Sequence, residues 1–207
     1  MLILWFERFG KFQMIISVIG SGGKTTYIHK LKDKYVFLNK TVLMCTTTHM
    51  LIEEDTLIDP SYDEIMHRIE TYGYCHAGNR CGEFKIEGLD SELLKQLKQV
   101  VDVILIEADG SKHLPLKFPN VNEPVVDPDS DEVVLISNLN GLNKPVKEAV
   151  HRYELTNLDP NELVTPKIMQ DLIRVYLKKL NKTFKIHVNG DRDLYTRCLK
   201  VLLEEDI

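Results

Sequence analysis

The chain has 207 residues, a length that favours one domain or one domain with a small appendage. Its hydrophobic residues (43%) and charged residues (28%) suffice for a core and a solvated surface without disulfides or metal ions. The formal net charge is −5 and the sequence has no basic block or stripe, so nucleic acid is not expected as a partner.

The first nine residues, MLILWFERF, begin with an apolar run that Glu7 and Arg8 interrupt. A signal peptide needs a longer apolar stretch and a small-residue cleavage site, and a membrane span needs about 20 apolar residues. We therefore expect a short helix or strand here, no membrane partner and a cytoplasmic location.

Apolar runs of strand length recur along the chain. They cover residues 14–19, 41–46, 100–106, 132–137 and 183–188. Near-continuous apolar strands are typical of a parallel sheet that is covered on both faces.

Segments of helical periodicity separate these runs. They cover residues 24–35, 61–71, 90–99, 165–176 and 191–202. The alternation predicts a three-layer α/β fold with a mostly parallel sheet and helices on both faces. We expect residues 1–207 to form a single domain.

Two regions break this alternation. Residues 72–89 contain four glycines and are interpreted as a small hairpin or loop excursion. Residues 110–131 are rich in proline and polar groups, which predicts a long loop over the carboxyl ends of the strands. A loop of that length in a compact domain is usually functional.

The four cysteines are irregularly spaced. Cys75-His76 followed by Cys81 offers thiolate and imidazole groups, which are zinc ligands, but no second pair has zinc-like spacing. We expect buried or surface thiols in a reducing cytosol rather than a metal site in this stretch.

A glycine-rich turn directly follows the first apolar run. It consists of Gly20, Ser21, Gly22, Gly23, Lys24, Thr25 and Thr26. Glycines let backbone N–H groups converge on phosphate oxygens, and the following helix adds the positive end of its dipole. Lys24 is expected to reach the β- and γ-phosphates, and the Thr25 hydroxyl to ligate a bridging Mg²⁺. The turn therefore predicts binding of a nucleoside triphosphate, ATP or GTP, with Mg²⁺, and it makes residues 1–207 a single nucleotide-binding domain of the three-layer P-loop NTPase type.

The turn departs from the full pattern G-x-x-x-x-G-K-[ST], because Val18 stands where that pattern has glycine. The shortened form resembles the G-T-N-G-K-T-T loop of the Mur ligases. Asn189-Gly190-Asp191 stands where guanine-binding proteins carry N-K-x-D, and glycine replaces the lysine. Guanine specificity is thus not supported, and the choice between ATP and GTP stays open.

Polar side chains end the second and third apolar runs, at the sheet edge where ligands bind in open α/β folds. Thr46, Thr47 and Thr48 are expected either to hold a phosphate, a Mg²⁺-bound water or a substrate oxyanion, or only to cap the chain at a strand end. Glu107 and Asp109 match the logic of a Walker B strand, with Asp109 orienting the metal and Glu107 polarising the attacking water.

Basic residues follow in the long loop and after the fourth apolar run. Lys112 and Lys117 could neutralise phosphate or an anionic substrate, although each alone is typical of a solvated lysine. His151 and Arg152 could contact an anion from another side, since the planar guanidinium of arginine suits phosphate.

In combination these motifs resemble one family. Gly20-Ser-Gly-Gly-Lys-Thr-Thr, Thr46-Thr-Thr, Glu107-Ala-Asp-Gly-Ser-Lys, Pro115-Leu-Lys, Glu123-Pro and His151-Arg are similar, in this order, to the selenium-dependent hydroxylase accessory proteins of the YqeC type. The resemblance runs from about residue 10 to the C-terminus. It implies a small cytoplasmic P-loop protein associated with maturation of selenium-dependent molybdenum hydroxylases, and it gives Lys112 and Lys117 more weight.

The expected function is therefore Mg²⁺-dependent binding and hydrolysis of a nucleoside triphosphate by an accessory protein of such a hydroxylase. Lys24, Glu107 and Asp109 would carry the chemistry. Two alternatives stay open: an ATP-dependent small-molecule ligase or kinase, as the Mur-like loop suggests, and a non-catalytic scaffold gated by nucleotide. The partners implied are a molybdenum hydroxylase or the proteins that mature its cofactor.

Overall fold

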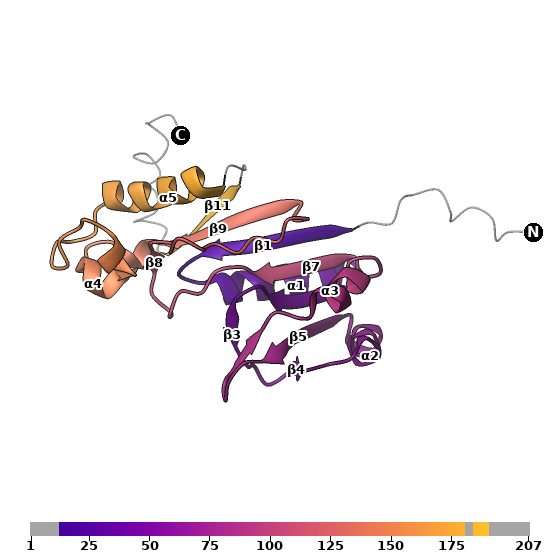
Figure 1. Cartoon of the computed structure of the whole chain (residues 1–207). Helices are drawn as coiled ribbons and strands as arrows, with labels where there is room; N and C mark the ends of the chain where they lie inside the picture. Colours follow the sequence, from indigo (N-terminus) through magenta and orange to yellow (C-terminus); the bar gives the residue numbers. More distant parts are fainter. Residues whose placement is uncertain (1–12, 181–183, 191–207) are drawn as a thin grey trace, which may run out of the picture.

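The computed structural model describes residues 13–180 and 184–190. Its first strand, β1 (Met14–Gly20), lies inside a large sheet. Within these residues nine strands form one sheet in the order β11-β9-β1-β7-β2-β5-β6-β3, with β4 paired to β5. Figure 1 shows β1 between β9 and β7, with α5 near one end of the sheet and α2 near the other.

The parallel strands are β2 (Val42–Thr46), β4 (Thr56–Ile58), β5 (Tyr74–Arg80), β7 (Val103–Glu107), β9 (Glu132–Asn138) and β11 (Lys185–Asn189) together with β1. At the far edge β6 (Lys85–Glu87) and β3 (His49–Leu51) continue the sheet with antiparallel pairing. A separate parallel pair joins β8 (Leu116–Lys117) to β10 (Val150–His151). The mostly parallel α/β sheet predicted from the sequence is confirmed.

Helices cover both faces of the sheet. Helix α1 (Lys24–Phe37) packs Ile28 and Tyr35 against one face, together with Val18 of β1. On the opposite face lie α2 (Tyr62–Tyr72), α3 (Ser91–Leu97) and α5 (Pro166–Leu180). The short helix α4 (Val146–Ala149) packs into that same second cluster of buried side chains. This arrangement confirms the predicted three layers.

Local sequence signals define the ends of α2. The Ser61 hydroxyl accepts a bond from the Glu64 N–H at 3.3 Å, and the Ser61 N–H donates to the Glu64 carboxylate at 2.8 Å, which is a capping box. Gly73 ends the helix with a φ of 80°, in the left-handed region that glycine adopts without strain. The capping box therefore defines the start of the helix, and the glycine defines its end.

Residues 72–89 form a hairpin of β5 and β6, which was one of the two predicted forms, but its first strand also belongs to the main sheet. Residues 74–80 form β5, which pairs in parallel with β2 and buries Cys75 and Ala77 in the main core. The glycines suggested turns, but Gly78 lies inside β5. Glycine is required there because a Cβ would come 2.7 Å from the Glu87 carbonyl oxygen. Only residues after 80 turn back, as β6.

Residues 110–131 connect β7 to β9 without a helix. Their first part lies at the carboxyl ends of the strands, and their last part returns to the other end of β1, where Asp131 bonds with the backbone of Ile15. The predicted first segment, residues 1–9, and the predicted last helix, residues 191–202, lie outside the described residues. No helix among the described residues is long and apolar enough to cross a membrane.

Candidate functional site

The carboxyl ends of the central strands bring the predicted residues together. Val18 of β1 pairs in register with Glu107 of β7, and Thr46 of β2 pairs with the same glutamate. On the other side Gly20 pairs with Ile136 of β9. Glu107 therefore lies beside the start of the glycine turn, which we define as residues 20–26.

The glycine turn has a backbone that other residues could not adopt. Gly22 has a φ of 84°, and a Cβ there would come 2.4 Å from the Asn138 Cβ and 2.6 Å from the Pro115 carbonyl oxygen. The side-chain amides of Asn138 and Asn189 both donate to the Gly22 carbonyl, at 2.9 and 3.0 Å. The ends of β9 and β11 thus hold the turn in shape. Its last residue before α1, Gly23, carries no side-chain cap.

Lys24 is folded back across the turn. Its ammonium donates to the Gly20 carbonyl and to the Ser111 hydroxyl, both at 3.0 Å, and lies 3.7 Å from the Glu107 carboxylate. Burial lowers the pKa of Lys24, while the negative charge of Glu107 acts in the opposite direction. The ammonium group therefore lies next to the open side of the turn, where its hydrogen bonds go to two uncharged oxygens.

Thr25 and Glu107 form a pair of oxygen groups beside this lysine. The Thr25 hydroxyl donates to the Glu107 carboxylate at 3.0 Å, and only 7% of Glu107 is exposed. Both residues line the same pocket. A hydroxyl and a carboxylate at this separation are hard oxygen donors of the kind that Mg²⁺ takes, so the residues present fit a Mg²⁺ ion here.

Asp109 has different surroundings from Glu107. It is fully buried, and its carboxylate accepts bonds from the Lys117 ammonium, the Gly20 N–H at 3.1 Å and the Tyr176 hydroxyl of α5 at 2.8 Å. Burial raises the pKa of Tyr176 well above its ordinary value, and Asp109 adds to that shift. Asp109 and Lys117 do not line the pocket that Glu107 lines.

Lys117 extends this buried pair into a network. Its ammonium lies 2.7 Å from the Glu123 carboxylate, which also pairs with Arg152. Burial raises the pKa of Glu123, but hydrogen bonds from Arg152 and Lys117 outweigh it and hold that pKa at about 2. The pKa of His151 is lowered to about 4, first by burial and then by Arg152 and Lys117. Glu123 therefore stays charged and His151 stays neutral at ordinary pH.

The pocket has a volume of about 910 Å³ and a basic lining, although the chain as a whole is acidic. The basic residues in its lining are Lys24, Lys85, Lys112, Lys144 and Arg152, and the acidic ones are Glu53, Glu107 and Glu123. Within the described residues, neither Lys112 nor Lys144 forms an ion pair. The excess of positive charge favours an anionic ligand.

Thr46, Thr47 and Thr48 do not all have the same role. Thr46 donates to the Glu107 carbonyl at 2.7 Å and accepts from the Thr48 N–H at 3.0 Å, and Thr47 donates to the Val125 carbonyl at 2.5 Å. These bonds cap the ends of β2 and β7. Of the three threonines, Thr48 alone lines the pocket. His151 lines it as well, whereas Ser21 is buried and donates to the Leu114 carbonyl.

Sequence reasoning missed several residues of the site. Asn138 and Asn189 are the last residues of β9 and β11, the same kind of position as Glu107 in β7, but an amide at a strand end does not by itself indicate a support of the turn. Glu123 and Lys144 lie in irregular segments, where no periodicity indicates which side chains face the pocket. Tyr176 lies in a helix that its apolar periodicity predicts, a signal that does not reveal the bond from its hydroxyl to Asp109.

Comparison with known proteins identifies the family of this chain. A family model described as YqeC protein matches residues 16–154, a range that contains the glycine turn, Glu107 and Arg152. The Uncharacterized protein YqeC of Escherichia coli (strain K12) is 31% identical over 172 residues, which is 77% of this chain and 67% of that protein. The resemblance predicted from the motifs is confirmed, and the chain belongs to the YqeC family.

Proposed function

We propose that this protein binds a nucleoside triphosphate with Mg²⁺ in the basic pocket and hydrolyses its terminal phosphoanhydride. The observation that carries the proposal is the grouping of Lys24, Thr25 and Glu107 at the open side of a glycine turn that begins a helix. An exposed helix start with positive-φ glycines is suited to a phosphate chain, because its N–H groups need acceptors.

Each residue then has a physical task. Lys24 exchanges the Gly20 carbonyl and the Ser111 hydroxyl for phosphate oxygens, which are stronger partners for an ammonium group. Thr25 and Glu107 would hold Mg²⁺, which neutralises charge on the phosphates when it is bound. We assign the metal-side carboxylate to Glu107 rather than Asp109, because only Glu107 contacts Thr25 and lines the pocket.

Hydrolysis needs a positioned water and compensation of the negative charge that develops on the transferred phosphoryl group. Lys24 supplies one fixed positive charge beside the turn. Lys112 and Arg152 line the same pocket from the long loop and from the residue after β10, and their cations suit the outer phosphate oxygens. The buried network behind them keeps Arg152 in place through Glu123.

The test is parallel calorimetric titration of ATP and GTP with Mg²⁺, together with phosphate-release assays, on wild type and variants. We expect Lys24→Ala to weaken nucleotide binding and Glu107→Gln to lower turnover at least about a hundredfold. Lys30→Ala is the matched control, since Lys30 lies exposed on the same helix. Undiminished hydrolysis in Lys24→Ala would sink the proposal.

A second candidate, phosphoryl transfer to an anionic acceptor, is favoured by the size of the pocket. Its volume of about 910 Å³ is near the upper end of the range of roughly 300–1,000 Å³ for small-molecule sites. The exposed Lys112 and Lys144 offer positive charge away from the glycine turn. ADP release that rises on addition of selenide, selenophosphate or a carboxylic acid would support transfer, and no stimulation by any acceptor would count against it.

The cellular role that we propose is the one the family resemblance implies, an accessory in maturation of a selenium-dependent molybdenum hydroxylase. It does not depend on which reaction the pocket performs. Co-purification with such a hydroxylase, with and without a nonhydrolysable nucleotide, tests it and also tests the scaffold alternative. Equal binding of the partner in both conditions would contradict gating by nucleotide.

A further inference from the structure

The antiparallel extension formed by β3 and β6 has an inner and an outer face. Met50 and Ile86 pair directly across the two strands and are buried, with 5% and 0% of their surface exposed. Because successive residues of a strand point to opposite faces, their neighbours point outward. His49 and Glu87, which also pair directly with each other, therefore lie side by side on the outer face.

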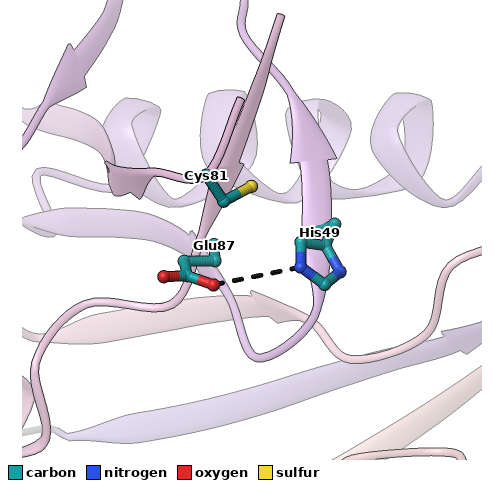
Figure 2. A group of neighbouring side chains, drawn as sticks. All are labelled: His49, Cys81 and Glu87. Carbon is teal, nitrogen blue, oxygen red and sulfur yellow. Dashed lines mark ion pairs between the residues drawn. The ribbon is translucent and has the colours of Figure 1, made fainter. Parts of the chain in front are cut away.

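Cys81 joins this pair from the end of β5. Its backbone N–H donates to the Lys85 carbonyl at 3.1 Å, which fixes the position of the residue at the start of the hairpin, and its thiol is free and exposed. Figure 2 shows the side chains of His49, Cys81 and Glu87 around a common space. Their ligand atoms all lie within 4.8 Å of one another, and His49 Nε2 is 3.9 Å from the Glu87 carboxylate.

We propose that His49, Cys81 and Glu87 bind a zinc ion. Thiolate, imidazole and carboxylate are the three ligand types that zinc takes in proteins. With metal–ligand bonds of about 2.0–2.3 Å, tetrahedral ligand atoms are roughly 3.4–3.8 Å apart. The present separations of up to 4.8 Å need to shrink by about 1.4 Å at most, which rotation of exposed side chains can supply on a backbone that β pairing holds in place.

Three protein ligands leave the fourth position of the zinc open, as in sites where zinc binds an exchangeable water or substrate. His49 and Lys85 both line the pocket of the candidate functional site, so the ion would lie at the pocket's β3–β6 edge. An anionic second ligand in the pocket could bind there. The zinc site is separate from Lys24, Thr25 and Glu107 and does not rest on the proposed nucleotide chemistry.

A neighbouring cluster offers the natural alternative and the control. Glu53, Asp55 and His76 also bring ligand atoms within 4.8 Å of one another. The carboxylates of this cluster already have partners: Glu53 pairs with His29 at 2.9 Å and with His76 at 3.3 Å, and Asp55 accepts from the Tyr74 hydroxyl at 2.9 Å, whereas the buried His76 Nε2 has no partner among the described residues. A metal ion there would have to break these bonds. A metal ion bound to His49, Cys81 and Glu87 would replace only the contact of 3.9 Å between His49 and Glu87.

The experiment is a titration of the full-length chain, stripped with a chelator, with Co²⁺ and then with Zn²⁺. We expect one equivalent of Co²⁺ to give a thiolate-to-cobalt charge-transfer band in the near ultraviolet, which Zn²⁺ removes. Cys81→Ser should abolish the band, and His49→Ala should weaken binding at least about tenfold. Glu53→Gln and Lys24→Ala should leave the band intact, the second even if nucleotide binding is lost. Circular dichroism confirms folding of each variant.

Three outcomes would overturn the inference. The wild type could show no charge-transfer band at one equivalent of Co²⁺. The band could persist in Cys81→Ser, which would assign the metal to another thiol. Alternatively, Glu53→Gln could lose the metal as completely as His49→Ala, which would place the ion in the neighbouring cluster.

Discussion

Replacing Asp109 with asparagine tests whether this carboxylate supports the fold or a metal ion. The side chains of Asp109 and Lys117 are both fully buried, and removal of one partner from such a pair costs about 3–5 kcal/mol. We take the lower end, about 3 kcal/mol, because Glu123 still lies 2.7 Å from Lys117 and asparagine keeps an oxygen that can accept from Tyr176. At about 2–4 °C per kcal/mol for a chain of this size, the melting temperature should fall by roughly 6–12 °C.

The assay is thermal unfolding by circular dichroism, combined with phosphate release measured well below the melting temperature of the variant. We expect the folded Asp109→Asn protein to keep turnover within about tenfold of wild type, a loss of about 1.4 kcal/mol or less. Glu107→Gln is the matched control, since it should lose turnover instead. An Asp109→Asn variant that melts with wild type but loses Mg²⁺-dependent turnover would refute this reasoning and return the metal role to Asp109.

Three further predictions concern the turn, a helix end and acid stability. Gly22→Ala should weaken nucleotide binding at least about tenfold in calorimetry, because its φ of 84° and the 2.6 Å approach to the Pro115 carbonyl leave no room for a Cβ. Ser61→Ala should cost about 1 kcal/mol through loss of the capping box with Glu64, lowering the melting temperature by about 2–4 °C without changing nucleotide affinity. Because the folded protein holds the pKa of His151 at about 4, against about 6.5 unfolded, the unfolded chain binds the extra proton between these values and stability should fall as pH drops from about 6.5 to 4. In His151→Gln the melting temperature should fall less over this pH range. An unchanged dependence of melting temperature on pH would show that His151 does not cause the fall.

The sheet and the glycine turn could be predicted because their signals are local. Apolar runs of strand length marked the central strands, and the order of strand, glycines, lysine and helix needs only about 20 consecutive residues to be recognised. Glu107 followed from the same logic, since a polar residue directly after a buried strand lies at the edge where parallel strands end. Each of these inferences depends on neighbours in sequence.

The roles of the two acids could not be separated in the same way. Both acids were expected to serve one Walker B site, but β7 ends at Glu107 and Asp109 is fully buried. The partners of Asp109 come from other parts of the chain, Lys117 from the long loop and Tyr176 from α5. Neither contact leaves a pattern in the residues around Asp109, so the buried network was not predictable. The place of β5 in the parallel sheet could not be predicted for a related reason, because Gly78 serves packing against β6 rather than a turn.

The connection from β7 to β9 explains how the Asp109 carboxylate can support the pocket without lining it. A crossover without a helix leaves residues 110–131 to form part of the pocket lining, with no regular structure except β8 to hold them. Asp109 bonds to Gly20 of the glycine turn on one side and to Lys117 of this loop on the other. Lys117 in turn pairs with Glu123, which holds Arg152. The buried charges therefore fix both the loop and Arg152 relative to the turn before any ligand binds, and fixed positive groups stabilise a phosphate more effectively than groups that must first be ordered.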